Sequence, residues 1–366
     1  MNIESEDLEA AVGAGVITQA QVDALRTFVA QRRQSSASSL GSEDEHFRFM
    51  RGFNDFFLAI GILLLGSGIC FFAGGNWVSN AVAAAVIWGL SEVLVGRMRL
   101  VLPGILLSIF FVVFAYLAVP IDFTSLLSPA QMRLFGGDTA LDLYARNLMP
   151  AVIAAKAPVA AAAAALYYWR FRLPFALLPI AGIAVMVAVA LASLAFGPMT
   201  PAARSLVILA CGIAVFGVAM AFDISDRERI TRRADCAFWL HLLAAPLIVH
   251  SIVSLLKVDF RSLNGETSVV ILLVVAALAV VAVLIDRRAM LVSTLFYVGF
   301  IIANALRGMN FQQASTDKTF IFFATLLVLG LFVIALGVGW QPLRRLLMKL
   351  ISPSLAARLP PVFNSI

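Results

Sequence analysis

Ten apolar stretches, each about 18 to 23 residues long, follow one another between residues 54 and 339. An α-helix needs about 20 apolar residues to cross a bilayer. Hydrophobic residues make up 61% of the chain and charged residues 13%, whereas soluble domains carry about 25% charged residues. This pattern excludes a single soluble core, a disordered chain and a disulfide scaffold. It predicts an all-α, polytopic transmembrane helical bundle with spans near 54–74, 77–95, 100–119, 149–169, 173–195, 204–222, 237–256, 267–285, 289–306 and 319–339.

The basic residues explain the net charge of +6. Most of them fall at the chain ends or on alternate connections, and cytoplasmic loops of membrane proteins are enriched in Lys and Arg. The pattern predicts both termini in the cytoplasm and contact with anionic lipid rather than nucleic acid. Arginine far outnumbers lysine and Ala, Val and Gly are abundant, which indicates a bacterial inner (plasma) membrane protein. The arginines between predicted cytoplasmic span ends are Arg97 and Arg99, Arg170 and Arg172, Arg227, Arg229, Arg232 and Arg233, and Arg287 and Arg288.

Four segments flank or interrupt the predicted bundle of residues 54–340. Residues 1–34 read as a cytoplasmic helical hairpin, in which Gly13 and Gly15 end one helix and Thr18 begins the next with Gln21 completing a capping box. We expect this hairpin to dock on the membrane, on a second copy of the chain or on a protein partner. The remaining segments are a flexible linker with an interfacial Phe/Arg-rich part at 35–53, a long outer loop at 120–148 and a cytoplasmic basic tail at 341–366.

Lys156 is the most unusual charge within a predicted span. A lysine near the middle of a membrane costs about 2.5–3.5 kcal/mol, and six consecutive alanines that follow Pro158 give a thin helix suited to close packing. Lys156 is therefore a candidate to hold an anionic substrate or to exchange a proton. The alternative is an ion pair with Asp122 or Asp142 at the outer rim.

His241 and His250 lie on either side of Pro246 in the seventh predicted span. Nine residues at about 100° each place them on opposite faces of a helix, so they cannot share a metal site. Each histidine is a candidate for a proton pathway. The alternative is a hydrogen bond to a neighbouring helix.

Four further polar residues lie near the ends of predicted spans. Glu92 is expected to form an ion pair at the rim, and Asp55 is expected to cap a helix, pair with an arginine or bind a cation. Asn304 and Arg307, three residues apart, share one helix face and are expected to be solvated at the outer rim. All four are also candidates for a substrate or proton pathway.

Motifs of soluble enzymes are missing from the sequence. No P-loop, dinucleotide-binding glycine pattern, zinc-protease motif or serine-hydrolase motif occurs, and the three cysteines lack metal-ligand spacing. The sequence therefore predicts neither a cofactor nor a metal, and a membrane-embedded enzyme acting on lipid is the weakest hypothesis.

Two short segments carry a resemblance. The tail segment Gly15-Val16-Ile17-Thr18-Gln19-Ala20-Gln21 resembles that of bacterial predicted multi-span inner-membrane proteins of unknown function. So does the first span, with Gly52-Phe53-Asn54-Asp55 at its start and Asn76-Trp77 after it. The resemblance implies a cytoplasmic hairpin before a membrane bundle and brings no functional residues.

Two functional hypotheses follow from these features. The first is a transporter or flippase-like protein, with Lys156 and the two histidines in its pathway. The second is a membrane scaffold or sensor that binds a partner through residues 1–34.

Overall fold

The computed structural model describes residues 12–16, 18–24, 53–121, 149–226, 229–257, 265–308, 318–351 and 359. Every regular element in these ranges is helical. The predicted linker and interfacial segment at 35–53, except Phe53, most of the outer loop at 120–148 and most of the predicted tail at 341–366 beyond residue 351 lie outside the described residues. The helices are α3 (Phe53–Ala73), α4 (Trp77–Ser91), η1 (Glu92–Arg97), α5 (Val101–Leu117), α8 (Met149–Phe171), η3 (Pro174–Ala176), α9 (Leu177–Phe196), α10 (Pro201–Ser225), α11 (Arg232–Leu255), α12 (Gly265–Leu284), η4 (Arg288–Met290), α13 (Leu291–Gly308) and α14 (Lys318–Met348).

Each of the ten predicted apolar stretches coincides with a helix. Among the described residues, seven helical segments are long and apolar enough to cross a membrane: α3, α4 with η1, α8, η3 with α9, α10, α11 and α14. Helix α5 and the apolar part of α12 are shorter. The membrane-spanning character of the chain agrees with the prediction, whereas ten spans and the inside location of both ends stay predictions.

The chain is divided into two compact units, and the smaller one contains residues 1–47 and 362–366. Its described part confirms the predicted capping box, because the Thr18 amide donates to Gln21 Oε1 at 2.8 Å and the Gln21 amide donates to Thr18 Oγ1 at 3.4 Å. Gly15 has a φ of 70°, the left-handed conformation expected where the preceding helix ends.

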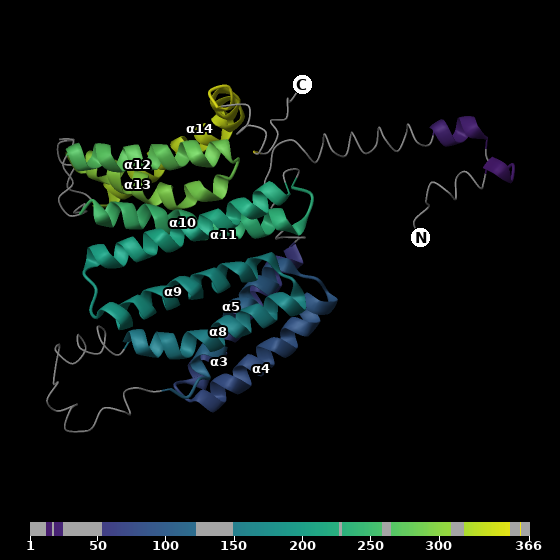
Figure 1. Cartoon of the computed structure of the whole chain (residues 1–366), viewed down its shortest axis with the longest axis horizontal. Coiled ribbons are helices and arrows are strands. Elements are labelled where there is room, and N and C mark those ends of the chain that lie inside the picture. The colour runs from purple at the N-terminus through teal and green to yellow at the C-terminus, as the bar shows by residue number, and fades with distance from the viewer. Residues whose placement is uncertain are drawn as a thin grey trace. The chain divides into compact units, whose positions relative to one another are not determined.

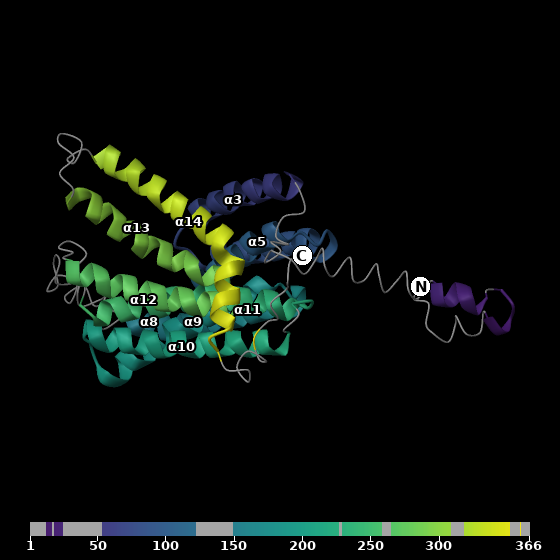
Figure 2. The ribbon, with the colours of Figure 1, turned by 90° about the horizontal axis from the view of Figure 1, so that it is seen from above.

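The larger unit, residues 48–361, is a bundle in which helices adjacent in sequence pack against each other. Pairs with extensive contact are α4 with α5, α8 with α9 and α10 with α11, and α11 also contacts α9 and α13 (Figure 1). In the most apolar stretch of α11 about half of the residues are buried, whereas in that of α14 only 6% of the residues are buried. Helix α11 is therefore central in the bundle. Helix α14 lies across its neighbours, as the view from above in Figure 2 shows.

Glycine permits the close approach of α10 and α11. A Cβ atom added at Gly212 would lie 3.0 Å from Leu247 Cβ and 3.3 Å from the Ile248 backbone nitrogen. Small residues at helix contacts allow such packing in membrane proteins. Gly217, on the same helix, has no atom within 4 Å of its added Cβ.

Helix α14 is longer than the predicted tenth span. We predicted a span ending near 339 and a tail from 341, but α14 continues through Pro342 to Met348. The extension carries Arg344, which is 1% exposed, and Trp340 in the preceding turn is equally buried. Contacts of these two side chains with the turn after α12, described below, favour continued helix past the proline.

Candidate functional site

A cluster of three buried polar side chains joins α10, α11 and the turn after α12. Asp223, His241 and Arg287 are 4%, 0% and 2% exposed. Helices α10 and α12 end at the same end of the bundle at which α11 begins, so the short connections bring the three side chains together. We call this end, where α4 with η1, α8, α10 and α12 finish, the arginine-rich end.

The Asp223 carboxylate is the centre of this cluster. His241 Nε2 lies 2.8 Å from Asp223 Oδ2. Arg287 Nε donates to Asp223 Oδ1 at 3.1 Å and to Oδ2 at 3.3 Å, and Arg287 Nη2 also donates to Oδ1. An ionised carboxylate only accepts hydrogen bonds, so we assign the proton of the 2.8 Å contact to His241 Nε2.

This assignment leaves His241 Nδ1 as an acceptor in the neutral ring. Within the described part of the chain, the buried Nδ1 atom has no hydrogen-bond partner. The ring packs edge-to-face on Phe216 at a centroid distance of 5.3 Å. A buried polar atom without a partner costs about 1–3 kcal/mol, so the site holds a proton acceptor at an energetic cost.

The turn between α10 and α11 fixes the positions of Asp223 and His241. Asp226 accepts hydrogen bonds from the Ile230 amide at 3.2 Å, the Thr231 amide at 3.0 Å and the Thr231 hydroxyl at 2.6 Å. Thr231 Oγ1 in turn accepts from the Arg233 amide at 3.2 Å and caps α11. Three acceptor contacts by one side chain set the register of the two helices.

Asp286, next to Arg287, organises a second ionic group. It accepts from Trp340 Nε1 at 2.7 Å and pairs with Arg229 at 3.2 Å and Arg344 at 3.4 Å. Arg229 Nη2 also donates to the carbonyls of Ile285 and Asp286 at 2.9 and 2.8 Å, satisfying acceptors left open where α12 ends. The α12 turn is therefore bonded to the segment that precedes α11 through Arg229, and to α14 through Trp340 and Arg344.

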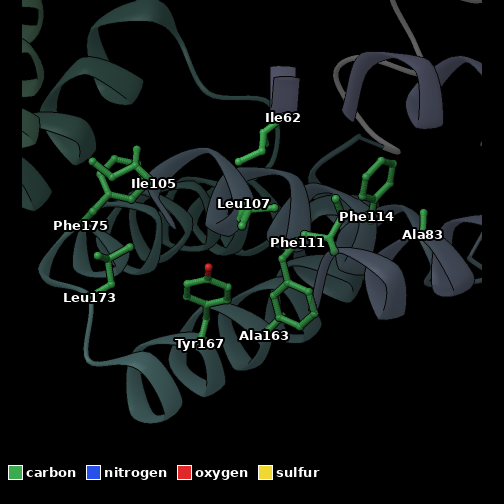
Figure 3. Packing of buried hydrophobic residues seen from close by; sticks show 11 residues of the cluster. Ile62, Ala83, Ile105, Leu107, Phe111, Phe114, Ala163, Tyr167, Leu173 and Phe175 are labelled. Carbon is green, nitrogen blue, oxygen red and sulfur yellow. The ribbon is translucent and has the colours of Figure 1, made fainter. Parts of the chain in front are cut away.

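A neutral polar group occupies the corresponding end of the first helices. The Tyr167 hydroxyl lies 3.1 Å from Ser91 Oγ and 3.3 Å from the Gly104 carbonyl, and Ser91 Oγ donates to the Ile87 carbonyl at 2.8 Å. Figure 3 shows the Tyr167 ring among buried apolar side chains, including Leu107 and Phe111. This group joins α4, α5 and α8 without a buried charge.

The structure places the predicted site residues at separate points of the bundle. Lys156 is half-buried, with Nζ 5.5 Å from the centroid of the Tyr116 ring in α5. The predicted partners Asp122 and Asp142 lie outside the described residues. His250 is exposed at its position in α11 and contacts the Tyr297 hydroxyl at 3.2 Å through Nδ1.

The remaining predicted residues also have different surroundings. Glu92 forms the expected rim ion pair, with Arg170 at 2.6 Å. Asp55 is 3% exposed in the first turn of α3. Asn304 and Arg307 lie in α13, and their side chains are outside the described part.

Of the predicted residues, His241 alone belongs to the buried ionic cluster. Sequence reasoning missed Asp223, because the predicted span ended at 222, and treated Arg287 as a determinant of topology. The sequence did contain one signal. The connections after the sixth and eighth predicted spans leave both span ends on the same side of the membrane, so charges at these ends can meet. Among the described residues, no three or more His, Cys, Asp or Glu side chains are grouped to hold a metal.

Comparison with known proteins adds no assignment. The chain matches no protein-family model and is not significantly similar to any curated protein or solved structure. The resemblance to predicted inner-membrane proteins stays a prediction.

Proposed function

We propose that this protein is a proton-coupled transporter of a bacterial inner membrane, with Asp223 and His241 as the proton-carrying pair. The observation that carries the proposal is His241 Nδ1, a buried acceptor with no partner among the described residues. Histidine exchanges protons near neutral pH more readily than other side chains. Ionisable groups within membrane segments are commonly part of ion or proton pathways.

The arrangement supplies a route for charge compensation. When Nδ1 takes a proton, the imidazolium lies 2.8 Å from Asp223, and the carboxylate then faces two cations, His241 and Arg287. When Asp223 is shared between two cations, its ion pair with Arg287 is weakened. Arg287 is next to Asp286 in the α12 turn. Proton uptake is therefore linked to the contacts of α10, α12 and α14.

A second candidate function is a partner-binding membrane anchor. The observation that favours it is the capping box of Thr18 and Gln21, which begins a helix in the separate N-terminal unit. In that case deletion of residues 1–42 abolishes partner capture, and His241 has only a structural role.

Charge movement across a reconstituted membrane tests the transport proposal. Proteoliposomes on a solid-supported membrane are exposed to a panel of amino acids, sugars, nucleosides and organic anions, with a pH gradient of either direction. We expect at least one compound to evoke a gradient-dependent current. His241→Gln should abolish that current, because an amide can donate to Asp223 but cannot carry a proton.

His250→Gln is the matched control, since the same change is made on the same helix at an exposed position. Both variants are first shown to elute as folded protein in detergent. A wild-type protein that gives no current with the whole panel contradicts the transport proposal. A current that survives in His241→Gln contradicts the role of His241.

A further inference from the structure

Two turns at the arginine-rich end have the same sequence pattern and a left-handed residue at the same position. Arg97-Met98-Arg99-Leu100 begins at the last residue of η1, and Arg170-Phe171-Arg172-Leu173 begins in the last turn of α8. Arg99 and Arg172 have φ angles of 56° and 51°. Leu100 and Leu173 are both extended and buried. Both copies of the pattern therefore place a left-handed arginine directly before a buried, extended leucine.

The repeated turn presents arginine at a position that glycine would fill with less strain. The left-handed conformation costs a residue other than glycine about 1–2 kcal/mol. The buried leucine fixes the turn, while the side chains of Arg97, Arg99 and Arg172 are exposed. Arg229, Lys257 and Asp286 also have positive φ angles, so the feature that the two turns share is an exposed arginine in this conformation directly before a buried leucine.

The two turns lie side by side. A Cβ atom added at Gly96 would lie 3.8 Å from the Phe171 ring, and one added at Gly104 would lie 3.6 Å from Leu173 Cδ2. The four arginines of the two patterns therefore share one surface between the hairpin of α4 and α5 and the hairpin of α8 and α9.

This surface has an excess of positive charge. Glu92 is the only Asp or Glu in residues 77–121 and 149–196, and it is paired with Arg170. The start of α11, which packs against η3, adds Arg232 and Arg233 and one acid, Asp235. The arginines outnumber the acids even when α11 is included.

Apolar side chains stand exposed beside the arginines. Trp169 is 74% exposed, and Val93 and Met98 are each 47% exposed. Exposed tryptophan beside arginine is typical of the layer where lipid headgroups meet the hydrocarbon core. A ligand that suits this surface has a negative headgroup and an apolar tail.

We propose that the paired turns form a binding site for an anionic phospholipid. Guanidinium groups bind phosphate oxygens through charge-assisted hydrogen bonds, and basic surfaces between membrane helices bind anionic headgroups. The acyl chains lie along Val93 and Met98, and Trp169 marks the level of the headgroup. This site is separate from the Asp223 cluster and does not depend on the proposed transport function.

Native mass spectrometry of the full chain in detergent tests this site. Phosphatidylglycerol and phosphatidylcholine are titrated separately, and the fraction of lipid-bound protein is measured. We expect tight binding of phosphatidylglycerol only. Arg99→Gly and Arg172→Gly preserve the left-handed backbone and remove the charge, and each should weaken binding about five-fold, or about thirty-fold together.

Lys257→Gly is the matched control. Lys257 is exposed and has a φ of 52°, but it follows α11 at the other end of the bundle, so its loss should leave binding unchanged. An unchanged affinity in the double variant overturns the proposal, as does equal weakening by Lys257→Gly or equal binding of phosphatidylcholine. Competition by free glycerol phosphate overturns the lipid assignment.

Discussion

In the two halves of the bundle, the helices are joined at the arginine-rich end by different kinds of buried polar contact. At the arginine-rich end, Tyr167 joins α4, α5 and α8 through neutral hydrogen bonds within an aromatic core. At the same end, Asp223 joins α10, α11 and the α12 turn through buried charges. The Tyr167 group shows that α4, α5 and α8 are held together at this end without a buried ion pair, since the Glu92–Arg170 pair nearby is partly exposed. Helix packing at this end therefore does not require buried charges, so the ionic cluster around His241 has a role beyond packing.

The largest expected effect comes from removing the charge at the centre of the ionic cluster. Asp223→Asn removes the carboxylate that pairs with the buried Arg287, 2% exposed, and breaking such a buried pair costs about 3–5 kcal/mol. Thermal unfolding in detergent should show a large fall in Tm. The double variant Asp223→Leu with Arg287→Met should recover much of the loss, and additive losses would show that the pair is not coupled.

The next effect concerns the helix contact that supports the cluster. Gly212→Ala forces a methyl group against the backbone of α11 and should cost about 1–3 kcal/mol through overpacking. Gly217→Ala, where the added Cβ meets no atom within 4 Å, is the control and should leave Tm unchanged or slightly higher. Equal behaviour of the two variants would argue against a close contact of α10 and α11 at Gly212.

Substitutions in the neutral group of Tyr167 and Ser91 should reduce the free energy of unfolding less. Tyr167→Phe removes the hydroxyl but leaves Ser91 bonded to the Ile87 carbonyl, so we expect a loss of about 0.5–1.5 kcal/mol. A double-mutant cycle of Tyr167→Phe and Ser91→Ala measures the coupling free energy between the two hydroxyl groups. A loss as large as that of Asp223→Asn would remove the contrast between the halves.

The smallest effect is expected at the surface ion pair. The side chains of Glu92 and Arg170 are 34% and 47% exposed, and exposed pairs contribute about 0–1 kcal/mol. Glu92→Gln should therefore change Tm little, and added salt should reduce the difference further. A large, salt-independent loss would mean that this pair is shielded from solvent.

The sequence predicted the regular elements more successfully than the site. Length and hydropathy locate the ten long helices of the described bundle, because an apolar run of this size has few alternatives to a helix in lipid. The local rule of capping correctly predicted the Thr18 and Gln21 contacts. Lys156 stood out in sequence by its position in an apolar run, yet in the structure it lies on Tyr116.

The ionic cluster was not predictable because its members lie at helix ends. Asp223 and Arg287 lie where charged residues are ordinary, so hydropathy gives no reason to select them. Their burial depends on which turns pack together, which is a tertiary property. His241 was selected because it lies inside a span, but its partner was not.

The protonation state of His241 in the full chain tests the central claim most directly. Protein labelled with ¹⁵N at its three histidines is reconstituted in lipid and measured by solid-state NMR across pH 5 to 8, the range in which histidine commonly changes charge. His241→Gln assigns the signals. The account predicts a neutral ring protonated at Nε2 at the high end of this range and an imidazolium at the low end. A His241 ring that keeps one protonation state throughout would contradict it.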